Sequence, residues 1–108
     1  MSEGNFEREA EMAIAAIERA LESSGLDVEI DSKDGGVLEL RFEDDSRMII
    51  NRHSAAREIW VAARSGGYHF RLDGAEWRDT REGSELFAAL SRLVSAQSGT
   101  GVVLSSRA

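Results

Sequence analysis

Carboxylates at regular spacing are the residues of this sequence with the most obvious capacity for chemistry. In LDVEID, residues 26–31, acidic and apolar residues alternate, with no Lys or Arg among them. Read as a strand, the stretch places three carboxylates on one face, about 7 Å apart, because same-face side chains repeat every two residues at a rise of ~3.3 Å. Carboxylate oxygens bind hard cations, and they also attract basic protein surfaces.

A second row of acids is predicted on an N-terminal helix. Apolar residues at helical spacing predict an amphipathic helix over residues 5–23. These residues are Phe6, Ala10, Ile14, Ile17 and Leu21. At ~100° per residue, four glutamates fall in one stripe beside the apolar face. If the helix packs beside the first strand, the two rows form one surface, which we call the acidic ridge. Its members are Glu7, Glu11, Glu18, Glu22, Asp27, Glu29 and Asp31.

The distribution of charge favours a functional interpretation of the ridge over that of a merely solvated face. The net charge of the chain is −7. Residues 1–34 contain ten acids and three bases, whereas residues 35–108 contain ten of each. Like charges four residues apart on a helix also cost a few tenths of a kcal/mol per pair. This asymmetry speaks against a nucleic-acid partner and favours cations or a basic protein surface.

The spacing of the acids predicts weak cation sites. The stretch DVEIDSKDGGVL looks like a calcium-binding loop, but Ser32 stands where that loop requires Gly and Leu38 where it requires Glu. Carboxylates about 7 Å apart along a strand do not converge easily on one ion. We therefore expect shallow sites with few protein ligands and little selectivity among divalent cations.

Length and composition predict one domain spanning residues 1–108. The chain has no Cys and no Pro, and no apolar run approaches the ~20 residues of a membrane span. The acidic N-terminus differs from a signal or transit peptide. We expect a cytoplasmic protein without membrane contact.

The elements that must position the acids follow from the patterning. After the first helix, short alternating segments separated by turn residues predict strands. They cover residues 26–31, 37–42, 47–51, 58–63, 68–72 and 76–78. A second helix is predicted over residues 83–97, ended by Gly99 and Gly101. Short turns imply antiparallel neighbours. The predicted fold is α+β, a two-layer sandwich with both helices on one face of an antiparallel sheet of five to six strands.

The open face of such a sheet would carry a tryptophan. If the apolar residues on either side of Trp60 face the helices, Trp60 faces the opposite way, near Asn51, His53 and His69. An exposed Trp in polar surroundings is typical of a binding anchor. The alternative is that a loop or the C-terminal tail covers it. Trp77 is predicted to pack against the helices.

Other motifs give weaker evidence of function. The Ser-Gly-Gly of residues 65–67 could cradle a phosphate, but it is more typical of a hairpin turn. His53 and His69 are too few and too scattered for a tight metal site. No arrangement of Ser, His and Asp, or of paired acids, is typical of catalysis.

These segments resemble the frataxin family, in particular its bacterial branch, over nearly the whole chain. The matching pieces are the acidic first helix and strand, DGGVLELRF, MIINRH, EIWVAARSGGYHF, the Trp77 strand and GSELFAALSRLV. The most diagnostic is Asn51 followed by the Ile59-Trp60 strand and SGGYHF. Two departures stand out: His53 replaces the usual Gln, and Ser54-Ala55-Ala56 stand where the family usually has a Pro.

The resemblance implies a frataxin-like sandwich that binds ferrous and ferric iron weakly and exchangeably, with other divalent cations able to substitute. It also implies docking on the cysteine desulfurase of iron–sulfur cluster assembly, near the scaffold protein, and modulation of sulfur transfer. We expect a regulatory or iron-chaperone protein and not an enzyme. The iron-facing residues would be Glu11, Glu18, Glu22, Asp27, Glu29, Asp31 and Asp34. The partner-facing residues would be Asn51, Arg52, His53 and Trp60. The implied state is a monomer, with oligomerisation in excess iron left open.

Two alternatives remain at this stage. In the first, the chain is an acidic interaction domain with no metal role, and the ridge only complements a basic partner. In the second, it is an enzyme such as a ferroxidase, which requires a preorganised multi-ligand site that the spacing does not offer.

Overall fold

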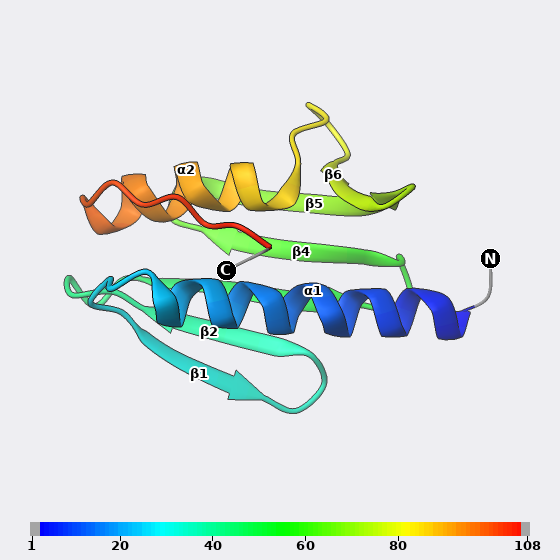
Figure 1. The fold of residues 1–108 in the computed structure, drawn as a ribbon, viewed down its shortest axis with the longest axis horizontal. Helices are drawn as coiled ribbons and strands as arrows, with labels where there is room; N and C mark the ends of the chain where they lie inside the picture. Colours follow the sequence, from blue (N-terminus) through cyan, green and yellow to red (C-terminus); the bar gives the residue numbers. More distant parts are fainter. Residues whose placement is uncertain (1–2, 107–108) are drawn as a thin grey trace.

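The computed structural model describes residues 3–106 and contains two helices and six strands (Figure 1). In chain order they are α1 (Glu3–Ser23), β1 (Glu29–Lys33), β2 (Val37–Arg41), β3 (Arg47–His53), β4 (Glu58–Ala63), β5 (Gly66–Asp73), β6 (Glu76–Asp79) and α2 (Leu86–Ser98).

The strands form one sheet in the order of the sequence, β1-β2-β3-β4-β5-β6, and every neighbouring pair is antiparallel. Both helices lie on the same side of this sheet, with α1 over β3 and α2 near β6 (Figure 1). The predicted two-layer sandwich is confirmed. One face of the sheet meets the helices, and the other is the open face.

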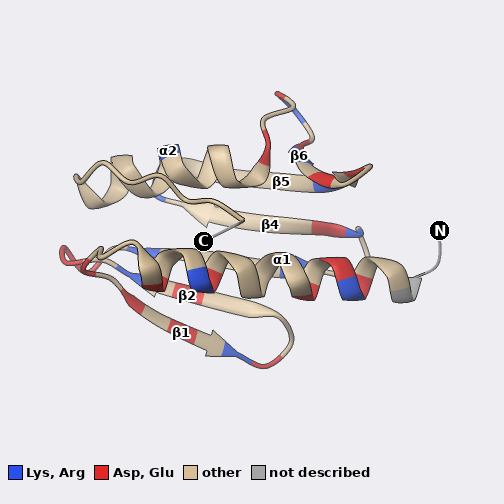
Figure 2. Ribbon diagram, in the orientation of Figure 1, with Lys and Arg blue, Asp and Glu red and all other residues tan. Residues whose placement is uncertain are grey.

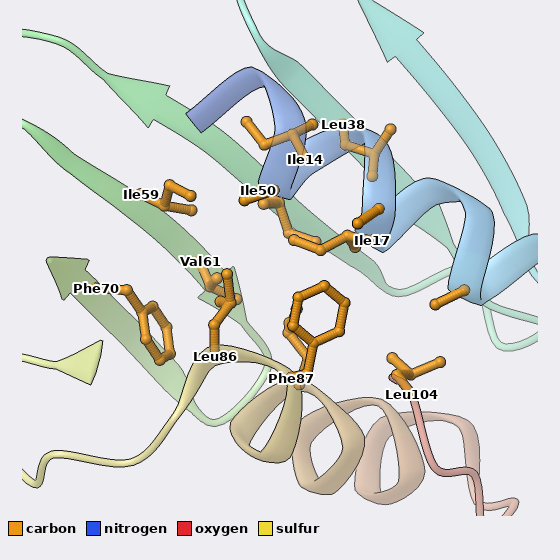
Figure 3. Close-up of a cluster of buried hydrophobic side chains, with 14 of the residues drawn as sticks. Ile14, Ile17, Leu38, Ile50, Ile59, Val61, Phe70, Leu86, Phe87 and Leu104 are labelled. Carbon is orange, nitrogen blue, oxygen red and sulfur yellow. The ribbon is translucent and has the colours of Figure 1, made fainter. Parts of the chain in front are cut away.

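The core fills the space between the two layers (Figure 3). Strand alternation sends one side chain in two toward the helices. Leu40, Ile50 and Ile59 are therefore completely buried, while their chain neighbours turn to the other face. Trp77 is also buried, and its ring meets that of Phe6 edge-on at a centroid distance of 5.9 Å. The predicted inward position of Trp77 is confirmed.

The first strand lies later in the chain than residues 26–31. Its ladder opens with Glu29 opposite Arg41, and the chain turns directly after Arg41, where the N–H of Phe42 donates to the carbonyl of Ser46. Residues 26–28 therefore have no neighbouring strand to pair with. The predicted alternation still holds through both segments, because residues 26, 28 and 30 pack against the core while residues 27, 29 and 31 are exposed.

The second helix begins at Leu86, three residues later than predicted, because Glu85 caps it. The Glu85 carboxylate accepts hydrogen bonds from the N–H groups of Phe87 and Ala88. Gly99 ends the helix, as predicted, and it adopts a left-handed conformation with φ of 78°. The tail beyond it returns along α2, where Leu104 is buried between the helices and does not cover the open face (Figure 1).

The Ser-Gly-Gly segment belongs to a hairpin, as its composition indicates. Ala63 pairs with Gly66, which leaves Arg64 and Ser65 as the turn between β4 and β5. The same antiparallel register places Trp60 opposite His69 and Asn51 opposite Trp60, all on the open face. The sheet thereby assembles a row of candidate contact residues from three strands.

Candidate functional site

The N-terminal half of the α1 stripe is paired within the protein. The guanidinium of Arg52 lies 3.2 Å from a carboxylate oxygen of Glu7 and 3.7 Å from one of Glu11. The Ser54 hydroxyl donates a second contact to Glu7, at 2.7 Å. Only 20 % of the Arg52 side chain is exposed, so this cation is held against the helix. These two carboxylates already have a positive counter-charge.

The C-terminal half of the same stripe is different. Glu18 and Glu22 form no ion pair or side-chain hydrogen bond with any other residue in the part of the chain that the structure describes. They are one helical turn apart and carry the same charge, so each lowers the cost of binding a cation near the other. This end of α1 lies next to the segment that leads into β1 (Figure 2).

The strand half of the ridge points to the open face of the sheet. Because Ile30 packs against the core, Glu29 and Asp31 on either side of it turn away from the helices. Basic residues meet them there: Arg41 lies 3.8 Å from Glu29, and Lys33 lies 4.0 Å from Asp31. The expectation of one continuous ridge is therefore corrected. The helix and strand rows lie on opposite sides of the β1 edge, since alternation that buries Ile30 forces this orientation.

Asp27 meets an acid that the sequence reasoning missed. A hydrogen bond to the Asp27 carboxyl group and its negative charge raise the pKa of Glu43. The two side chains line a shallow hollow of about 260 Å³ that also includes Asp44 and Gln97. Glu43 follows β2, and its proximity to residue 27 depends on the β1–β2 register, which the spacing of the acids alone does not give.

The seven predicted metal ligands are not gathered at one point. Within residues 3–106, no three His, Asp or Glu side chains are placed to share a metal ion. Asp34 lies in the exposed turn between β1 and β2, whereas Glu11, Glu18 and Glu22 lie on α1. The structure instead offers carboxylates singly or in pairs.

On the open face, three rings form a stack that we call the aromatic stack. Trp60 lies between His53 and His69, with ring centroids 3.8 Å and 4.4 Å away and interplanar angles of 12° and 10°. His53 is held in turn by the N–H of Ala56, which donates to its Nδ1 at 3.3 Å. The predicted outward position of Trp60 is confirmed, and both faces of its indole are covered by imidazoles.

Glu58 lies on the open face with these rings and holds Trp60 in place. One carboxylate oxygen accepts from the Trp60 indole N–H at 2.8 Å, and the other accepts from Arg71 at 2.6 Å. Burial pushes the pKa of Glu58 up, but the hydrogen bonds from Trp60 and Arg71 and the charge of Arg71 outweigh it. The pKa therefore lies below its ordinary value, and the carboxylate is ionised at neutral pH.

The four predicted partner-binding residues do not share one face. Asn51, His53 and Trp60 lie together on the open face, as expected. Arg52 lies between Asn51 and His53 in the chain, so alternation turns it toward α1 and its glutamates. The expectation that Arg52 is a sheet-face contact is corrected.

Glu58 and Arg71 were missed as members of the open face. Their position could have been found from the sequence. Residue 58 is two residues before Trp60, residue 71 is two after His69, and one hairpin joins the strands. They were missed because polar residues in a strand are expected to be exposed, and a buried acid can be identified only from the hydrogen-bond donors around it.

Among residues 3–106, neither helix combines the length and apolar character required to cross a bilayer.

Comparison with known proteins places nearly the whole chain in one family. The family model of the frataxin-like domain matches residues 1–100. The chain is 53% identical over 104 residues to the iron–sulfur cluster assembly protein CyaY of Dechloromonas aromatica, covering 96% of this chain and 99% of that one. It is 48% identical over 102 residues to the protein of that name in Paraburkholderia xenovorans, covering 94% and 96%.

A solved structure shows the same architecture. The frataxin of Psychromonas ingrahamii superposes with a TM-score of 0.88 at 32% sequence identity, covering 97% of this chain and 99% of that one. The similarity therefore extends over both helices and the whole sheet.

Proposed function

Since this chain belongs to the frataxin family, we propose that it is an accessory protein of iron–sulfur cluster assembly, which regulates cluster formation or delivers iron and is not itself an enzyme. The name of its relatives, at 53% and 48% identity over almost the full chain, supports the assembly role. The fold supports it as well, because the sandwich presents two solvent-facing surfaces of different chemistry: the acidic stripe of α1 and the open face of the sheet with its aromatic stack.

The observation that carries the proposal is the uneven pairing of the acids. Among the acids of the predicted ridge, Glu18 and Glu22 have no basic neighbour within the described residues, and Asp27 faces another acid, Glu43. The other four, Glu7, Glu11, Glu29 and Asp31, each have one. We propose that ferrous and ferric iron bind near Glu18 and Glu22, and near Asp27, through one or two carboxylates and water at each place. Such sites are weak and exchangeable, and cobalt and manganese substitute for iron because nothing enforces softness or geometry.

The second part of the proposal concerns docking. The open face, with Asn51, His53 and Trp60, contacts the cysteine desulfurase–scaffold assembly, and the acidic rows of α1 and β1 complement basic surfaces on it. An aromatic anchor surrounded by polar groups supports the first contact. The acidic excess of residues 1–34 supports the second, since complementary charge mainly accelerates encounter.

An anaerobic titration with ferrous iron tests the metal part. Two-dimensional NMR of the labelled protein should show broadening that begins at residues 18–27 and at Glu43, and reaches Glu7 and Glu11 only at higher iron. Cobalt and manganese should affect the same residues. Iron that causes no change, or separate sites for the three ions, would contradict this part.

One observation favours a second candidate, an acidic interaction domain without a metal role. No group of three ligands converges within the described residues. In that case binding to the desulfurase would be unchanged by iron or by a chelator, and it would still weaken as salt rises. Association rates measured from about 50 to 300 mM salt, with and without iron, separate the candidates, because only the metal-binding candidate predicts a change when iron is added. Both should associate more slowly as salt rises, since exposed charges are screened over ~8 Å at physiological ionic strength.

A further inference from the structure

Glu58 is unusual among the open-face residues because it is buried. Only 6% of the residue is exposed, although neighbouring side chains on this face meet solvent. Both carboxylate oxygens have donors: the indole N–H of Trp60 at 2.8 Å on one, and the guanidinium of Arg71 at 2.6 Å on the other. The first oxygen also lies 3.6 Å from Nδ1 of His69. Three side chains from two strands therefore converge on one acid.

These contacts fix the orientation of Trp60. Its faces are covered by His53 and His69, and its only donor is bonded to Glu58. The register supports the arrangement, since Trp60 pairs with His69 and Glu58 pairs with Arg71 directly across β4 and β5. The indole cannot turn without breaking a charge-assisted hydrogen bond and two stacking contacts. The part of the indole that these contacts leave accessible is its edge.

We infer that Glu58 is a positioning residue for the docking face. It holds Trp60 in the aromatic stack, so that a protein partner meets the edge of the stack and not a free indole. This inference rests on the proposed docking function. Holding the side chain in place before association lowers the conformational cost of binding.

The indole resonance of Trp60 tests the positioning directly. In Glu58→Ala, the Nε1–H of Trp60 loses its acceptor, so its NMR signal should shift and its exchange with solvent should rise about fivefold or more, the equivalent of one hydrogen bond. Glu58→Gln keeps an acceptor oxygen and should restore most of the parent behaviour. Arg71→Gln removes the other partner of Glu58 and should leave the indole signal close to that of the parent.

Trp77 supplies an internal control, because its indole lies on the other face of the sheet and should not change in any of these variants. If Glu58→Ala disturbs the fold, the parent protein gives the same test. As pH falls through the lowered pKa of Glu58, the Trp60 signal should move while that of Trp77 stays. A Trp60 signal unaffected by Glu58→Ala, or by the protonation of Glu58, would overturn the inference.

Binding to the desulfurase–scaffold assembly gives the second measurement. Glu58→Ala should weaken binding about fivefold, and Glu58→Gln less than twofold, with Trp60→Ala as the reference for loss of the ring. Equal weakening by Ala and Gln would overturn the positioning role. If Trp60→Ala itself binds like the parent, the proposed docking face fails, and the indole signal alone then decides whether Glu58 positions Trp60.

Discussion

The two tryptophans occupy opposite faces of the same sheet and have opposite surroundings. Trp77 on β6 faces the helices, is 6% exposed and meets Phe6 edge-on. Trp60 on β4 faces away from the helices and is held by two imidazoles and a carboxylate. The contacts of the first are apolar and those of the second are mainly polar and aromatic.

This difference shows how a small sandwich separates stability from recognition. The covered face buries apolar area, which is the dominant favourable term in folding. The open face contributes less burial, so its side chains are free to serve a partner if polar contacts hold them in place. Substitutions on the two faces should therefore affect different measurements. Two predictions test this division, and two more extend the comparison to acids with and without partners in the protein.

The largest effect is expected for Trp77→Ala. Removing this ring leaves a cavity against Phe6 and α1, so the free energy of unfolding should fall by about 3–5 kcal/mol. Urea unfolding followed by circular dichroism measures it. Binding by the fraction that remains folded should be near that of the parent. A loss below about 1 kcal/mol would show that the covered face does not depend on this residue.

Trp60→Ala should show the reverse pattern. Loss of two stacking contacts and of the hydrogen bond to Glu58 should lower the free energy of unfolding by about 2 kcal/mol, less than the loss expected for Trp77→Ala. Binding to the desulfurase–scaffold assembly should weaken by more than about 1 kcal/mol if the ring is an anchor. Calorimetry on the two tryptophan variants at equal folded fraction compares them directly. Unfolding of Trp60→Ala as severe as that of Trp77→Ala would remove the distinction between the faces.

The acidic stripe of α1 allows a matched pair of variants that sharpens the comparison further. Glu7→Gln with Glu11→Gln removes the counter-charges of Arg52 and should lower the free energy of unfolding by about 0.5 kcal/mol. Glu18→Gln with Glu22→Gln removes the repulsion between two acids that have no basic neighbour, so it should raise the free energy of unfolding by a few tenths of a kcal/mol.

Both variants remove two charges from one helix, so they control for the change in net charge. Melting curves at low and high salt measure the effects, and the difference between the variants should shrink as salt rises. Iron binding should suffer mainly in the Glu18 and Glu22 variant. Equal shifts of the melting temperature in both variants would contradict the assignment of a paired and an unpaired half.

The fold could be predicted because local signals agree with one another. Helical spacing in residues 5–23 and alternation in the short segments gave the helices, the strands and the inward side chains correctly. The strand boundaries were less accurate because they depend on partners. Residues 26–28 alternate as a strand does, but β2 turns away at Phe42 and leaves them unpaired.

The site was predicted in its members more than in its arrangement. Alternation placed Trp60 on the open face, but it also places Arg52 on the covered face, where it pairs with Glu7. The contact between Asp27 and Glu43, and the burial of Glu58 beside Arg71, depend on the register between strands. Register is a tertiary property, so the spacing of acids within one segment does not reveal which of them acquire basic neighbours.

The smallest effect is expected for the pH dependence of stability at the β2–β3 turn, where the exposed carboxylate of Asp44 is hydrogen-bonded to other residues of the protein. Hydrogen bonds from the side chain and backbone of Ser46, with a further contribution from Arg64, lower the pKa of Asp44 to about 2, from an ordinary value of 3.8. Because the folded state favours the ionised form, its contribution is present above the ordinary pKa and is lost as pH falls toward 2.

Asp44→Asn should therefore destabilise the protein at pH 5 to 7, and the difference from the parent should vanish as pH approaches 2. Arg64→Gln removes one of the contributing groups, so in that background the effect of Asp44→Asn should be smaller but still present. Urea midpoints at pH 7, 5, 4 and 3 give the comparison. If the loss of stability caused by Asp44→Asn stayed constant over this range, the turn would depend on the shape of Asp44 and not on its charge. The Asp44 carboxylate would then resemble the unpaired acids of α1 more than the paired ones.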